Sequence, residues 1–100
     1  MLIVHVFFSV NEADRANALE TLLAEAPTVL ARKGCISFTP VLDPTDPARL
    51  GIVEEWAEAD AFEQYTSSRE FAEIGKVLRP LMTAPPVSRR FDAQLIESVN

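Results

Sequence analysis

The sequence predicts an α+β domain of the ferredoxin-like class, with the element order β-α-β-β-α-β in 100 residues. Short runs rich in β-branched and aromatic residues predict four strands. Apolar residues at helical spacing predict helices after the first and third strands. Two right-handed crossovers then give one antiparallel sheet in the spatial order 4-1-3-2, with the helices on one face. Because no linker or repeat interrupts the pattern, residues 1–100 form a single domain.

The first predicted strand, Leu2 to Val10, is apolar on both faces. Alternation divides its residues between one face with Leu2, Val4, Val6, Phe8 and Val10 and another with Ile3, His5, Phe7 and Ser9. A strand with two apolar faces is covered on both, so this strand is expected to be central in the sheet.

The first helix is expected from Asn11, as its N-cap, to about Lys33, because Gly34 provides a C-terminal stop. Pro27 should kink or split this helix, since it removes one backbone hydrogen bond and clashes with the preceding turn. The predicted buried stripe comprises Ala16, Leu19, Leu22, Leu23, Ala26 and Leu30.

The second and third strands, Cys35 to Leu42 and Leu50 to Trp56, are joined by an Asp- and Pro-rich turn and should pair antiparallel. Pro40 cannot donate to a ladder, which makes the second strand an edge strand or a bulged one. Alternation places Glu54 on the same face as Trp56, where an ion pair with a residue such as Arg90, between strands or between subunits, is expected. Glu55 lies on the opposite face.

The second half of the chain predicts two helices and a last strand. A short helix is expected at Asp60 to Tyr65. Ser67 or Ser68 should cap a second, from Arg69 to about Met82, in which Gly75 makes room for another group. The last strand is expected at Ser88 to Ile96.

The composition of the chain argues against several classes of binding partner. The net charge of −6 argues against nucleic acid and anionic membranes, which attract basic surfaces. The apolar N-terminal run is too short to span a bilayer. A single cysteine, Cys35, fits a cytoplasmic protein, and one His, one Cys and scattered acids offer no metal site.

A homodimer is expected from the two apolar faces of the sheet. Helices cover only one face, so Phe7 or Phe38 would be left in water on a monomer. A second copy packed sheet to sheet would cover these side chains.

Several short motifs resemble the antibiotic biosynthesis monooxygenase family over nearly the whole chain. They are Lys33-Gly34-Cys35-Ile36-Ser37-Phe38, the Asp-Pro pairs at 43–44 and 46–47, Val53-Glu54-Glu55-Trp56, Phe71, and Leu78-Arg79-Pro80-Leu81. The resemblance implies a dimeric α+β barrel. It also implies one of three activities: cofactor-independent oxygenation of phenols and quinols, haem degradation, or isomerisation of a phosphorylated autoinducer.

The chain departs from this family at three positions. Tyr65 and Glu70 stand where many members carry His. The autoinducer isomerase is similar to the members with both His residues, so their absence counts against the isomerase activity. Gly75 matches the iron-ligating His of the haem-degrading members. Haem cleavage is therefore not expected.

The expected site is an apolar pocket between sheet and helices, lined by Phe7, Phe38, Trp56, Phe62, Tyr65 and Phe71. The resemblance places the Trp56 ring near this pocket, although core packing would also explain it. Tyr65 is either a hydrogen-bond donor to a phenolate or a packed ring. His5 is either the base that takes a phenolic proton or a histidine satisfied by Asp92 or Gln94. Arg90 is expected to contact substrate.

The predicted function is a monooxygenase that oxidises a small aromatic or quinol-like substrate with O2, without metal or flavin. One alternative is an isomerase of a small phosphorylated carbonyl compound, in which Arg89 or Arg90 would hold the anion. The other is a ligand-binding dimer without catalytic activity, since fold does not fix function.

Overall fold

The computed structural model describes all 100 residues and contains the predicted elements in the predicted order. The strands and helices are β1 (Leu2–Ser9), α1 (Arg15–Leu30), β2 (Cys35–Leu42), β3 (Arg49–Trp56), α2 (Ala59–Thr66), α3 (Arg69–Leu78) and β4 (Val87–Asp92). Short 3-10 turns precede α1 at Glu12–Asp14 and follow α3 at Arg79–Leu81. None of the helices is both long and apolar enough to cross a membrane.

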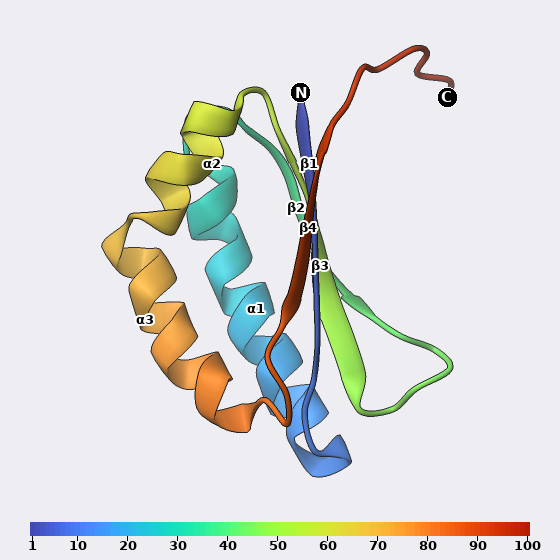
Figure 1. Cartoon of the computed structure of the whole chain (residues 1–100), viewed down its shortest axis with the longest axis vertical. Helices are drawn as coiled ribbons and strands as arrows, with labels where there is room; N and C mark the ends of the chain where they lie inside the picture. Colours follow the sequence, from blue (N-terminus) through green and yellow to red (C-terminus); the bar gives the residue numbers. More distant parts are fainter.

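The four strands form one antiparallel sheet in the order β2-β3-β1-β4, which confirms the predicted order. β1 is central and β2 is an edge strand, with a register shift between Cys35 and Ser37. All three helices lie on one face of the sheet, and the other face carries no helix (Figure 1). The ferredoxin-like α+β fold is therefore confirmed.

The register of β1 assigns each residue of the sheet to a face. Val4 pairs with Glu54 on one side and with Arg90 on the other, and this row faces the helices. His5 pairs with Val53 and Arg89, and this row faces away from them. Functional side chains on the two rows are separated by the sheet itself.

The core lies between the sheet and the helices. Its fully buried side chains include Trp56, Leu22, Leu50, Val4, Val10 and Val29. α1 packs on β2 and β3, whereas α3 packs on α1 and α2. The half of the sheet formed by β1 and β4 is therefore less closely covered, and a space remains under α3.

Pro27 does not split the first helix, because α1 runs unbroken from Arg15 to Leu30. Pro27 lies in the last turns of α1 and is exposed. It has no backbone N–H, so the carbonyl of Leu23, which is also exposed, lacks its helical hydrogen-bond donor. Water can satisfy that carbonyl, so the missing bond does not end the helix. Asn11 has an extended backbone, but its side chain does not cap the helix.

The predicted stripe of the first helix is rotated relative to the observed one. Ala18, Leu22 and Val29 are buried, whereas Leu23 and Leu30 are 51% and 46% exposed. Ser68 caps α3, since its Oγ accepts a hydrogen bond from the Phe71 amide at 3.2 Å. α3 ends four residues earlier than predicted and β4 ends at Asp92.

Candidate active site

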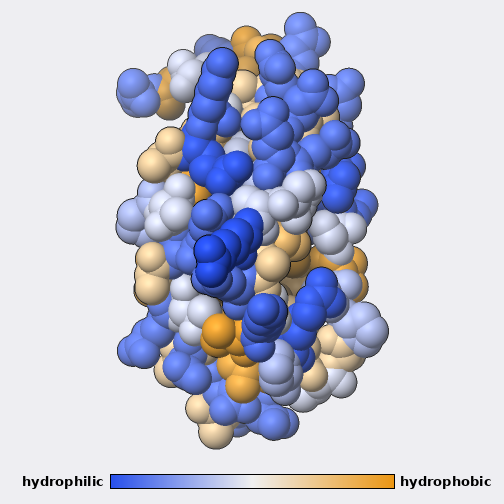
Figure 2. Space-filling view, turned by 90° about the vertical axis from the view of Figure 1, so that its left-hand side faces the viewer, coloured by the Kyte–Doolittle hydropathy of each residue, from blue (hydrophilic) through white to orange (hydrophobic).

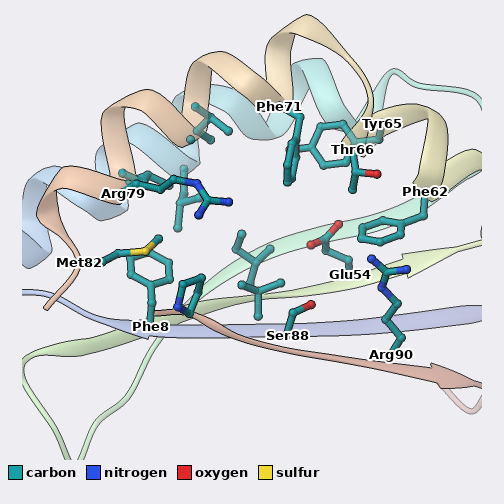
Figure 3. Close-up of a pocket in the computed structure, with 17 residues that line it drawn as sticks. Phe8, Glu54, Phe62, Tyr65, Thr66, Phe71, Arg79, Met82, Ser88 and Arg90 are labelled. Atoms are coloured by element: carbon teal, nitrogen blue, oxygen red, sulfur yellow. The ribbon is translucent and has the colours of Figure 1, made fainter. Parts of the chain in front are cut away.

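A cavity of about 260 Å³ fills the space between α3 and the half of the sheet formed by β1 and β4. Ten of its 17 lining residues are hydrophobic, so a ligand would enter a mostly apolar environment. The space-filling view toward the helices shows apolar side chains in a recess among hydrophilic ones (Figure 2). The close-up shows side chains from α2, α3, β1, β3 and β4 converging on this space (Figure 3).

Glu54 is the one acidic side chain that lines the pocket, and it is only 2% exposed. Its Oε1 accepts a hydrogen bond of 3.0 Å from Trp56 Nε1, and no cation lies within ion-pair distance. Burial raises the pKa of Glu54 to about 7, with the Trp56 hydrogen bond acting in the opposite direction. The prediction that Glu54 forms an ion pair with Arg90 is therefore wrong.

The carboxyl group of Glu54 points into the pocket (Figure 3). With a pKa near neutrality, it can accept a proton and release it again in the physiological pH range. Alternation along the strand places Glu54 and Trp56 together on the buried face, and that was the available sequence signal. Because an ion pair was expected for Glu54, it was not among the predicted site residues.

Aromatic rings form one continuous cluster that includes Trp56, the hydrogen-bond partner of Glu54. Trp56 is fully buried and stacks on Tyr65 with 5.5 Å between ring centroids. Phe71 contacts the edge of Tyr65 at 5.3 Å, and Phe62 contacts Trp56 at 5.8 Å. Phe62, Tyr65 and Phe71 line the pocket as predicted. Trp56 and Phe38 were also predicted to line it, but they are buried behind these rings, and Phe38 is not left in water.

The Tyr65 hydroxyl stays protonated at neutral pH. Burial raises the pKa of Tyr65 above its ordinary value, and the neighbouring charges of Glu54 and Glu25 raise it further. Tyr65 is only 3% exposed, and the Arg32 guanidinium lies 5.9 Å from its ring centroid. Arg32 in turn bonds Glu70 at 3.1 Å. Tyr65 is thus a packed aromatic wall with a neutral hydroxyl.

The structure does not bring His5 and Phe7 to the pocket, which corrects the predicted lining. Both lie on the face of the sheet that carries no helix. The His5 ring packs on Phe91 at 5.3 Å, and the Arg49 guanidinium lies 4.2 Å from the Phe7 ring centroid. Since β1 is apolar on both faces, its pattern does not indicate which face the helices cover.

Two arginines border the pocket. Arg90, predicted from the sequence, places its guanidinium 4.8 Å from the Phe62 ring centroid. Arg79 was not predicted to contact a substrate, and it reaches the pocket from the turn that follows α3. Neither guanidinium forms an ion pair. The pocket therefore combines aromatic walls, one buried acid and two unpaired cations.

A family model described as "Antibiotic biosynthesis monooxygenase" matches residues 1–77. The chain belongs to this family. The match covers β1 through most of α3, and so it includes the Glu54–Trp56 pair and the aromatic walls. No curated protein sequence matches the chain significantly.

Solved structures share the fold of this family member at low sequence identity. A Deinococcus radiodurans protein, provisionally assigned as an antibiotic biosynthesis monooxygenase, is 21% identical with a TM-score of 0.88, covering 100% of this chain and 97% of its own. A provisional assignment of the same kind from Caulobacter crescentus CB15 is 23% identical with a TM-score of 0.87, covering 94% and 90%. A conserved Bacteroides thetaiotaomicron protein of unknown function is 23% identical with a TM-score of 0.82, covering 90% and 94%. At these identities the likeness shows a shared fold.

Proposed function

We propose that this chain is a monooxygenase that oxidises a small phenol or hydroquinone with O2, using neither a metal nor an organic cofactor. The observation that carries the proposal is the buried Glu54 carboxyl. It opens onto an apolar pocket, has no cationic partner and has a pKa of about 7. Such a group is suited to accept the proton of a hydroxyl bound beside it.

Proton transfer is the first step. A phenol with a pKa near 10 is barely ionised at neutral pH. Held against the Glu54 carboxylate, its O–H bond breaks, and the proton passes to the carboxylate oxygen. The resulting phenolate is electron-rich and can reduce O2 directly. Trp56 Nε1, 3.0 Å from Glu54 Oε1, keeps the carboxyl in place for this transfer.

Electron transfer and oxygen insertion follow within the pocket. The phenolate gives one electron to O2, and the phenoxyl radical and superoxide combine in a C–O bond at a ring carbon that bears hydrogen. Protonated Glu54 returns its proton to the outer oxygen of this peroxide. Loss of the C–H proton and cleavage of the O–O bond release water and leave a quinone. The substrate supplies all four electrons, so no external reductant is needed.

The aromatic walls would supply orientation and exclusion of water. Phe62, Tyr65 and Phe71 contribute three rings to the lining, and their mutual edge-on and stacked contacts fix their planes. A flat substrate held between such walls keeps its hydroxyl against Glu54 while O2 approaches the ring. Restricting water protects the peroxide from premature hydrolysis.

The active species in this proposal is a homodimer. The face of the sheet without helices presents half-buried apolar side chains, among them Ile3, Phe7, Val53 and Phe91. A second copy packed on this face would remove them from water and leave the pocket, on the opposite face, open to substrate.

Oxygen uptake by purified, metal-free protein with a panel of hydroquinones and polyphenols tests the proposal. The wild type should consume O2 faster than autoxidation, and Glu54→Gln should lower the rate by about a hundredfold or more. Glu55→Gln is the matched control, because it removes the same charge from the adjacent residue on the other face of β3. Uptake that is equal in the two variants would exclude Glu54 as the base.

A further inference from the structure

The Arg79 side chain is directed into the pocket by the helix that precedes it. Arg79 begins the 3-10 turn Arg79–Leu81 directly after α3. Its side chain lies back along the helix over Gly75, where a Cβ atom would stand 3.6 Å from Arg79 Nε. The absence of a side chain at Gly75 leaves this path free. Figure 3 shows the guanidinium pointing into the space that Glu54 also faces.

The charge of Arg79 is not balanced by any acid of the chain. The arginines at 32, 49 and 69 are each paired with a carboxylate at 3.1 Å. Arg79 and Arg90 form no such pair, although the chain carries 15 acidic residues and a net charge of −6. Arg90 lies over the Phe62 ring, so Arg79 is the pocket cation with no partner of either kind.

We propose that the pocket selects an aromatic substrate that carries a carboxylate, with Arg79 binding the carboxylate and Glu54 facing the ring hydroxyl. The proposal rests on the proposed oxygenase function and names the substrate class of the same site. A guanidinium presents two parallel N–H donors that match the two oxygens of a carboxylate. Arg79 is exposed at the edge of the pocket, so a bound aromatic ring that covers it would strengthen this contact relative to the same contact in water.

The size and shape of the pocket fit a hydroxylated aromatic acid. Its volume of about 260 Å³ lies below the range of about 300–1,000 Å³ typical of drug-sized ligands, and so favours one or two rings. Arg79 comes from the end of α3, and Glu54 comes from β3 on the far side of the cavity (Figure 3). A ring between them would direct its carboxylate toward Arg79 and a ring hydroxyl away from the carboxylate toward Glu54. The 5-hydroxyl of 2,5-dihydroxybenzoate, meta to the carboxylate, is such a group.

Calorimetric titration under anaerobic conditions tests this inference without turnover. The ligands are 2,5-dihydroxybenzoate, its methyl ester and 2,5-dihydroxybenzenesulfonate. The acid should bind the wild type at least about tenfold more tightly than the ester, as expected for a charge-assisted hydrogen bond. Arg79→Gln should abolish this preference. Lys76→Gln, which removes an exposed cation of α3 outside this pocket, should preserve it.

The outcomes separate this inference from the oxygenase proposal. An Arg79-dependent preference for the acid in a protein that consumes no O2 would support the inference and leave the oxygenase proposal unsupported. O2 uptake together with equal binding of acid and ester would overturn the inference and leave the oxygenase proposal standing. Equal loss of preference in Lys76→Gln would also overturn it, since any nearby cation would then suffice. Tighter binding of the sulfonate than of the acid would overturn the carboxylate assignment.

Discussion

Glu54 Oε1 accepts a hydrogen bond of 3.0 Å from Trp56 Nε1, and both side chains are withdrawn from water on the helix-covered face of β3. The indole N–H can only donate, so it stabilises the ionised carboxylate. Burial favours the protonated acid and is the larger effect, and the resulting pKa is about 7. The pair thus holds a carboxyl group near the midpoint of its titration at neutral pH.

Replacing Trp56 by Phe should raise the pKa of Glu54 further. The variant removes the one hydrogen bond that favours the ionised form, which is worth about 1.5–3 kcal/mol when the acceptor is charged. The titration midpoint should rise by about one to two pH units. NMR of a ¹³C-labelled Glu54 carboxyl measures it directly and is insensitive to moderate loss of stability.

Tyr65→Phe is the control for this titration. It keeps the ring that stacks on Trp56 at 5.5 Å and leaves the indole hydrogen bond in place. The midpoint of Glu54 should then stay near 7. A midpoint that rises equally in both variants would show that packing of the cluster, rather than the indole N–H, sets the pKa.

The buried Glu54 carboxyl should also make the stability of the fold depend on pH. Its pKa is about 7 when folded against an ordinary value of 4.5, so between these pH values the folded state binds a proton that the unfolded chain has released. The contribution of Glu54 to the free energy of unfolding is therefore fully present below about pH 4.5. It falls as the pH rises to about 7 and does not change further above that pH. The loss amounts to about 3 kcal/mol.

Glu54→Gln isolates this contribution, because glutamine is neutral at every pH. The difference in unfolding free energy between variant and wild type, measured by urea denaturation, should shift in favour of the variant by about 3 kcal/mol between pH 4.5 and pH 8. A difference that stays constant over this range would mean that Glu54 is ionised in the folded protein throughout.

The order of elements and the order of strands were predictable because they depend on patterns that repeat along the chain. Alternation in β1 and β3 and the Pro-rich turn between β2 and β3 fix the strands and their pairing. The effect of Pro27 was not predictable in this way. Its cost depends on whether the orphaned carbonyl meets water, and that depends on the rotation of α1 about its axis.

The site was only partly predictable. Phe62, Tyr65, Phe71 and Arg90 line the pocket as expected. His5 and Phe7 do not, because alternation separates two faces without telling which one the helices cover. Whether Glu54 bonds Trp56 or Arg90 depends on how deeply its side chain is buried and on its rotamer. The order of charged residues along a strand predicts neither. Arg79 enters the site through the turn after α3, and the predicted helix extended past that turn.

Gly51 and Gly75 should respond oppositely to alanine. A Cβ at Gly51 would meet the Val6 carbonyl oxygen and stand 2.5 Å from Phe7 Cδ1, so a central pair of strands would have to move apart. Gly51→Ala should cost about 1–3 kcal/mol or more. Gly75 lies within α3 with only Arg79 Nε nearby, at 3.6 Å, and Gly75→Ala should stabilise by up to about 1 kcal/mol.

Urea denaturation of the two alanine variants, at one pH, measures this contrast. Substitutions at Gly75 also test whether the Arg79 side chain lies over this residue. The methyl group of Gly75→Ala would be at ordinary contact distance from Arg79 Nε and should leave ligand binding unchanged. The larger side chain of Gly75→Leu should displace the guanidinium and weaken binding of the acid. If Gly51→Ala were as stable as the wild type, the β1 backbone at Val6 and the Phe7 ring would both have to move readily away from β3.

Charging the face of the sheet without helices should weaken the proposed dimer. Val53 is half-buried in the middle of this face, opposite His5 and Thr39. Val53→Lys would bring two like charges into a symmetric interface and should raise the dimer dissociation constant by more than about a hundredfold. Sedimentation equilibrium should then find a species of 11.1 kDa in place of one twice that mass. Val77→Lys, at a 50% exposed position on α3, is the control and should remain dimeric. A wild-type protein that sediments as a monomer would show instead that Ile3, Phe7 and Phe91 tolerate water, and the pocket would then function in a single chain.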